Sequence, residues 1–126
     1  MPENLKADHK SYEQNKNAAV LSDKAYNLFV SNYLNDEKEG ESPLFSPLLF
    51  KTGRKGLPPT SFQVCGMDPL RDEGLIFERL LREEEGIKTK LEVYPGLPHG
   101  FASIAPHLSA SKKFVEDSFK GVEWLL

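Results

Sequence analysis

The spacing of apolar positions predicts one helix in the first half of the chain. Residues 1–21 are polar and lack periodicity, so we expect a loop with at most a helical turn there. Ser22 is a good N-cap for a helix that ends near Asn35. Residues 36–59 contain four prolines, which exclude a long regular helix, and we expect the apolar patch 44–50 to dock on a core. The positions that share the helical spacing are Ala25, Leu28, Phe29, Asn32 and Tyr33.

The second half begins with a strand and a helix. Residues 61–66 form a short apolar run closed by glycine, which predicts a buried strand. A turn at Pro69 follows, and Asp72 is a candidate N-cap for a helix that runs to about Glu85. Gly86 is well placed to close this helix. The apolar stripe of the predicted helix is Ile76, Phe77, Leu80 and Leu81, and Glu78 and Arg82 add a favourable i,i+4 pair.

A second strand and a last helix complete the pattern. Residues 88–94 alternate strictly, and their charged face predicts a strand at the edge of a sheet. An amphipathic helix is expected from Ser109 to the C-terminus, with an apolar stripe of Val115, Phe119, Val122 and Leu126. Strands joined by a helix at this spacing are almost always parallel. The second half therefore predicts an α/β fold with two parallel strands and flanking helices.

Composition narrows the possible partners and locations. The 126 residues suffice for one domain, with 39% hydrophobic residues, 28% charged residues and a net charge of −3. We therefore expect no nucleic-acid partner, and no apolar stretch is long enough for a membrane span. The N-terminus has no apolar run typical of a secretory signal. Cys65 is the only cysteine, so an intrachain disulfide is excluded, and a cytoplasmic location is the expectation.

Two residues that can carry chemistry follow the two predicted strands. Asp68 comes two residues after the first strand, and His99 comes five residues after the second. Neighbouring parallel strands lie about 4.8 Å apart and end at the same rim of the sheet, where reacting groups collect. A carboxylate that accepts from the Nδ1–H of a histidine leaves Nε2 to deprotonate a nucleophile. The spacing thus predicts the Asp–His half of a Ser–His–Asp triad, in the chain order of α/β-hydrolases.

Other interpretations of these residues stay open. Asp68 could only cap a turn, and His99 could be an ordinary loop residue. Asp72 is a rival acid, although its position suits a helix cap better. Cys65 could act as a nucleophile, but its place in an apolar strand favours a small buried side chain. We expect no metal or cofactor: Glu83–Glu85 reads as a solvated helix end, His9 and His107 lack ligand-like spacing, and no phosphate-binding glycine loop is present.

Two stretches carry a family resemblance. The strings D-P-L-R-D-E-G at 68–74 and Y-P-G-L-P-H-G-F at 94–101 resemble the C-terminal signature of hormone-sensitive-lipase-like carboxylesterases. Residues 11–15 also resemble a segment of fungal members. The resemblance implies that Asp68 and His99 are triad members and that carboxylic esters are the substrates. It further implies that 57–126 is the C-terminal βαβα unit of an α/β-hydrolase, with the last two of eight strands, and that 1–56 is a cap-like insertion and its connection.

The sequence departs from this family in one respect. It contains neither the nucleophile motif G-x-S-x-G nor the H-G-G oxyanion motif. We therefore predict that the chain alone does not hydrolyse esters. The alternative is a non-catalytic hydrolase-like protein that self-associates, or pairs with a partner chain such as an N-terminal hydrolase half, through its exposed strand edge. A third possibility, a prolyl-oligopeptidase or dienelactone-hydrolase type of chain, fits residues 68–74 less well.

Overall fold

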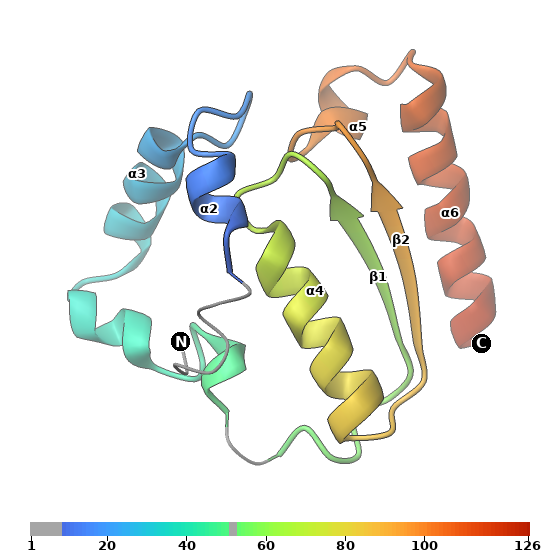
Figure 1. Ribbon diagram of the computed structural model, residues 1–126, viewed down its shortest axis with the longest axis horizontal. Coiled ribbons are helices and arrows are strands. Elements are labelled where there is room, and N and C mark those ends of the chain that lie inside the picture. The colour runs from blue at the N-terminus through green and yellow to red at the C-terminus, as the bar shows by residue number, and fades with distance from the viewer. Residues whose placement is uncertain (1–8, 51–52) are drawn as a thin grey trace.

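The computed structural model describes residues 9–50 and 53–126, and a parallel pair of strands lies at its centre (Figure 1). β1 (Thr60–Cys65) pairs with β2 (Thr89–Tyr94), with Phe62 opposite Leu91 in the middle of the ladder. The connection between the strands is α4 (Arg71–Arg79), which continues as the π-helical turn η3 (Leu80–Glu84). The predicted parallel strand–helix–strand unit is confirmed.

The remaining elements lie before and after this unit. A last helix follows β2 as predicted, after a short helical turn, and the first half is mostly short helical segments. These elements are α2 (Ser11–Gln14), α3 (Asp23–Tyr33), η1 (Glu37–Glu41), η2 (Pro47–Leu49), α5 (Phe101–Ile104) and α6 (Ser109–Leu125).

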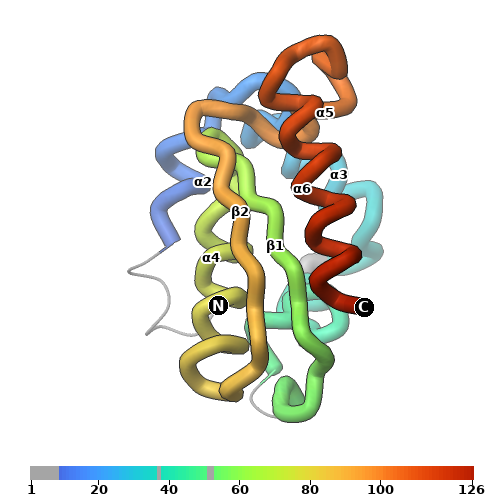
Figure 2. Tube along the Cα trace, turned by 90° about the vertical axis from the view of Figure 1, so that its right-hand side faces the viewer, coloured from blue at the N-terminus to red at the C-terminus, as the bar shows by residue number. Residues whose placement is uncertain are grey.

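The two long helices of the second half pack on opposite faces of the sheet (Figures 1 and 2). On the α4 face, the ring of Phe62 meets that of Phe77 with 6.1 Å between centroids. On the α6 face, Gln63 Nε2 donates a hydrogen bond of 2.9 Å to the carbonyl of Phe114. Because neighbouring residues of a strand point to opposite faces, Phe62 and Gln63 anchor one helix each. Because the two strands are parallel, their carboxyl ends lie at the same edge of the sheet, between the two helices.

The core is small and divided between the two faces. The predicted stripe of the helix after β1 is confirmed: Ile76 in α4 and Leu80 and Leu81 in η3 are buried, and Phe77 is half-buried. Leu48 from the proline-rich connection packs against Ile76 and Leu80, so part of that patch docks as expected. Leu44, in contrast, is 90% exposed. On the other face, the buried side chains are Cys65, Tyr94 and Phe101, with Leu97, Ala102, Ala110 and Phe114 packed against them.

The predicted end of the helix is confirmed, whereas its predicted start is wrong. Gly86 has φ +66°, the left-handed conformation that closes a helix. Helix α4 begins at Arg71, and Leu70 occupies the N-cap position without a side-chain cap. Asp72 therefore lies inside the first turn. Its carboxylate instead accepts hydrogen bonds from the backbone of Lys10 and Ser11, a use that local sequence spacing cannot reveal.

The predicted apolar stripes of α3 and α6 do not face the sheet. Helix α6 turns another side to the sheet, and this side makes polar as well as apolar contacts: Tyr94 donates to Asp117, Ser118 donates to Gln63, and Phe114 packs against Tyr94. Within the part of the chain that the structure describes, both apolar stripes are largely uncovered. Their exposed members are Leu28, Phe29 and Tyr33 on α3 and Val115, Phe119, Val122 and Leu126 at α6.

Candidate active site

Asp68 and His99 meet at the rim where both strands end. His99 Nδ1 lies 2.7 Å from Asp68 Oδ2, within hydrogen-bond distance. Asp68 lies in the turn between β1 and α4, and His99 lies in the loop between β2 and α5. The spatial prediction from the sequence is confirmed, because parallel strands bring two residues 31 positions apart together.

The turn after β1, residues 66–72, is here called the acid turn, and it lies directly against the loop after β2. The N–H of Gly66 donates to the carbonyl of Tyr94 at 2.8 Å, and Met67 N donates to Leu97 O at 3.0 Å. A Cβ on Gly66 would lie 2.9 Å from the Cα of Pro95, which is closer than real contacts allow. Glycine is therefore required here for the acid turn and the histidine loop to approach each other.

The carboxylate of Asp68 is oriented by its own turn. Its Oδ1 accepts from the N–H of Leu70 at 2.8 Å, which leaves Oδ2 to His99. Asp68 is only 7% exposed, whereas the His99 side chain is 47% exposed. Because an ionised carboxylate can only accept, the contacting Nδ1 carries the proton, and Nε2 is the basic nitrogen. No partner for Nε2 lies among residues 9–50 and 53–126, so it is free to act on a reacting group.

His99 borders an apolar groove of about 710 Å³. The walls come from α3, from the segment before it and from the proline-rich connection, so the predicted cap-like half of the chain forms most of the groove. Val20 adopts φ +73°, which is strained for a β-branched residue. The lining residues are Val20, Leu21, Tyr26, Phe29, Val30, Tyr33, Phe45, Leu70 and His99.

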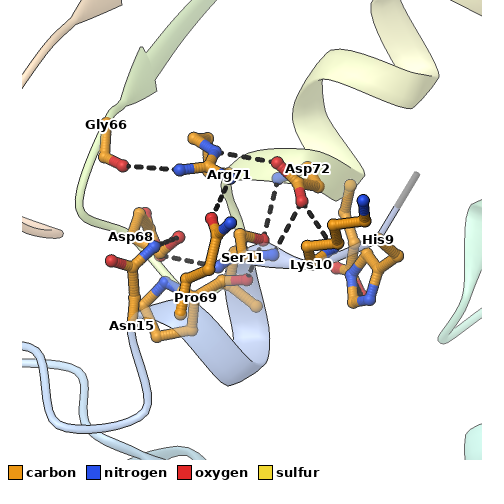
Figure 3. Close-up of polar contacts among 12 residues, drawn as sticks. His9, Lys10, Ser11, Asn15, Gly66, Asp68, Pro69, Arg71 and Asp72 are labelled. Carbon is orange, nitrogen blue, oxygen red and sulfur yellow. Dashed lines mark hydrogen bonds and ion pairs between the residues drawn. The ribbon is translucent and has the colours of Figure 1, made fainter. Parts of the chain in front are cut away.

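The short helix α2 is bonded to the acid turn (Figure 3). Ser11 Oγ donates to the carbonyl of Pro69 at 2.6 Å, and Asn15 Nδ2 donates to the carbonyl of Asp68 at 3.2 Å. Arg71 Nη1 donates to the carbonyl of Gly66 at 3.1 Å. Sequence reasoning missed these three residues. No periodicity marks these residues, and the signals that point to them are the family resemblances: residues 11–15 for Ser11 and Asn15, and the string at 68–74 for Arg71.

The rival acid, Asp72, has a structural role. It is 6% exposed and pairs with Arg71 at 2.7 Å, and no contact joins it to His99. Burial acts to raise the pKa of the Asp72 carboxyl, but the Arg71 guanidinium and the N–H groups of Lys10 and Ser11 outweigh it. The net result is a pKa below the ordinary value, so Asp72 is ionised at neutral pH, as a triad acid would also be. The observation that favours Asp68 over it is that His99 contacts Asp68 and not Asp72.

Cys65 is a poor nucleophile in this environment. It is buried in β1, and burial followed by the nearby charge of Asp68 raises the pKa of its thiol. Among the described residues, no group of three or more His, Cys, Asp or Glu side chains could hold a metal ion. None of the helices in residues 9–50 and 53–126 has the length and apolarity needed to cross a membrane. The cytoplasmic location stays a prediction.

The sequence of this chain is similar to those of known hydrolases. The profile of a family described as alpha/beta hydrolase fold matches residues 1–103. An AB hydrolase superfamily protein of Schizosaccharomyces pombe is 44% identical over 126 residues, which is 100% of this chain and 36% of that protein. The versiconal hemiacetal acetate esterase of Dothistroma septosporum is 35% identical over 127 residues, or 100% of this chain and 37% of its own length. The chain spans about a third of the length of these relatives.

A more distant relative and two solved structures show the same family similarity. The hormone-sensitive lipase of Mus musculus is 33% identical over 87 residues, covering 68% of this chain and 11% of the lipase. The crystal structure of vibralactone cyclase matches 99% of this chain and 35% of its own, with a TM-score of 0.89 and 41% identity. A hyperthermophilic esterase from Pyrobaculum calidifontis matches 85% of this chain and 35% of its own, with a TM-score of 0.77 and 27% identity. The chain belongs to the alpha/beta hydrolase fold family, which confirms the fold class and the resemblance seen in its sequence.

Proposed function

We propose that this chain supplies the acid and the base of a serine carboxylic ester hydrolase. The observation that carries the proposal is the 2.7 Å contact between His99 Nδ1 and Asp68 Oδ2 at the carboxyl ends of two parallel strands. Two of the relatives are named as an esterase and a lipase, and this supports ester hydrolysis as the reaction class. We further propose that residues 57–126 are the C-terminal βαβα unit of the hydrolase and that 1–56 form a cap-like segment.

The geometry supports the following division of labour. Asp68 keeps the proton of His99 on Nδ1, so the Nε2 lone pair points away from the acid. Nε2 takes the proton of a serine hydroxyl as the hydroxyl attacks the ester carbonyl. It then returns that proton to the departing alcohol, and the acyl–enzyme is hydrolysed by the same steps with water. The carboxylate stabilises the imidazolium formed in between and is not itself protonated.

The apolar groove beside His99 is the candidate position for the non-reacting part of the ester. A hydrocarbon chain or ring bound there is removed from solvent and contacts the aromatic side chains of Tyr26, Phe29 and Phe45. The sequence holds no G-x-S-x-G motif, so in this proposal the serine and its oxyanion donors belong to polypeptide outside the 126 residues. A purified sample of this chain alone should therefore leave p-nitrophenyl acetate intact.

A chimera tests the catalytic assignment directly. The matching segment of the Dothistroma septosporum esterase is replaced by this chain, and hydrolysis of p-nitrophenyl acetate is measured. Asp68→Asn and His99→Ala should each lower kcat by about three orders of magnitude or more, because triad members act as a unit. His107→Ala is the matched control, since His107 is exposed and lies outside the groove. If His99→Ala and His107→Ala had the same activity, the proposed function would fail.

A second candidate function is non-catalytic association. Its support is the combination of one unpaired edge of β1 in a sheet of two described strands with the uncovered stripes on α3 and α6. An unpaired strand edge and uncovered apolar faces favour binding of another polypeptide, which can add a strand to the sheet. Sedimentation of the purified chain tests it: concentration-dependent assembly would support association, and a monomer with a cooperative melt would contradict it. Phe119→Glu should then reduce assembly, whereas the exposed polar substitution Glu123→Gln should not.

A further inference from the structure

Three carbonyls of the acid turn accept hydrogen bonds from side chains, and the Asp68 carbonyl also accepts from the backbone N–H of Arg71 at 3.1 Å. The carbonyls of Gly66, Asp68 and Pro69 accept from the side chains of Arg71, Asn15 and Ser11, respectively. The donors Asn15 and Ser11 are 53 and 58 residues away from their acceptors in sequence. Leaving a buried carbonyl without a donor costs about 1–3 kcal/mol. Removing the Ser11 hydroxyl takes this donor from Pro69 O, whereas Asp68 O keeps its bond from Arg71 N when Asn15 is replaced.

Ser11 contacts the acid turn at two points, in its middle and at its C-terminal end. Its hydroxyl donates to Pro69 O and accepts from Asp72 N at 3.1 Å. In return, the carboxylate of Asp72 accepts from the backbone N–H of Ser11 at 2.7 Å. Ser11 is fully buried (0% exposed), so water cannot replace these contacts. The reciprocal bonds, visible in Figure 3, hold α2 and the first turn of α4 as one unit.

The orientation of Asp68 follows from this unit. Its carboxylate accepts from Leu70 N, which lies in the same turn, and from His99. A change in the backbone path at Pro69 therefore moves Oδ1 and Oδ2 together. Displacement of a catalytic group by about 1 Å is enough to cost up to a hundredfold in rate.

We propose that Ser11 and Asn15 are positioning residues that set the Asp68 carboxylate toward His99 through the backbone of the acid turn. They touch neither His99 nor the groove, so they act only through the turn. The inference rests on the proposed function for its effect on rate. Its effect on the His99 ring can be measured without any catalysis, because loss of the Asp68 contact allows the proton to move from Nδ1 to Nε2.

The test uses ¹⁵N signals of the His99 ring in the full 126-residue chain, which report the tautomer. Ser11→Ala and Asn15→Ala should each lower the fraction of the Nδ1–H tautomer. In the chimera with the Dothistroma septosporum esterase, each should reduce kcat about tenfold with less than a twofold change in KM. Ser118→Ala is the matched control, because its hydroxyl also bridges two elements, at Gln63 and Phe114, away from the acid turn.

The outcomes separate positioning from a purely structural role. If Ser11→Ala and Asn15→Ala lowered the melting temperature yet left tautomer and kcat as in Ser118→Ala, the inference would be overturned. If Ser11→Ala does not fold, the test is carried out with Asn15→Ala alone. Asp68→Asn distinguishes the two proposals: if it left the His99 tautomer unchanged, the Asp–His pair itself would be refuted. If Asp68→Asn changed the tautomer but Ser11→Ala and Asn15→Ala did not, only the positioning role would fall.

Discussion

Gly66→Ala is the substitution that tests most directly how the Asp–His pair is assembled. A Cβ at this position would lie 2.9 Å from Pro95 Cα, 3.1 Å from Gly96 N and 3.1 Å from Tyr94 O. All three atoms belong to the backbone at the end of β2 and directly after it, so no side-chain rotation can make room. The added methyl must push the acid turn away from the histidine loop.

The magnitude follows from two opposing effects. Overpacking of this kind typically costs about 1–3 kcal/mol, and the absence of a movable neighbour places this site at the upper end. Loss of glycine freedom in the unfolded chain offsets about 0.4–1 kcal/mol. We therefore expect a net loss of about 2 kcal/mol in the free energy of unfolding, together with a weaker contact between Asp68 and His99.

Urea unfolding followed by circular dichroism measures the stability change, and the ¹⁵N signals of His99 measure the contact. Gly121→Ala is the matched control. Its Cβ would lie 2.8 Å from Ser61 Oγ, a hydroxyl that can rotate or be removed. Adding Ser61→Ala should therefore convert Gly121→Ala into a stabilising change of up to about 1 kcal/mol, the helix-propensity gain. The reasoning would be refuted if Gly66→Ala were as mild as Gly121→Ala and left the His99 ring unchanged.

Three further predictions concern single groups. The lowered pKa of Asp72 means that its stabilising contribution is present above about pH 4 and is lost as the pH falls through the folded-state pKa. In Asp72→Asn, the urea midpoint should therefore change less with pH between about pH 5 and 2 than in the unsubstituted chain. The same dependence on pH in both chains would contradict this. The raised pKa of buried Cys65 predicts slow reaction with a thiol reagent at neutral pH until the chain is denatured, and fast labelling of the native chain would count against it. Val20→Gly relieves roughly 1 kcal/mol of backbone strain, and added glycine freedom in the unfolded chain offsets about 0.4–1 kcal/mol of it, so the urea midpoint should change little; a large fall would contradict the strain.

Local sequence was sufficient wherever a short stretch of chain satisfies its own backbone. Ser22 caps α3 by accepting from Ala25 N at 3.3 Å, and Gly86 adopts the positive φ that closes the helix before β2. The Asp–His contact was also predictable, because parallel strands carry the residues that follow them to one rim. The catalytic role of the pair stays a prediction until the chimera is measured.

The tertiary structure alone decided which faces are covered and what holds the acid turn. The spacing of Val115, Phe119 and Val122 specifies an amphipathic helix, but in the tertiary structure it is another side of α6 that contacts the sheet. The bonds from Ser11 and Asn15 to the acid turn join residues more than fifty positions apart. Periodicity records which residues share a face of one element, whereas contacts between elements depend on how the whole chain folds back, and a single sequence carries no local signal for them.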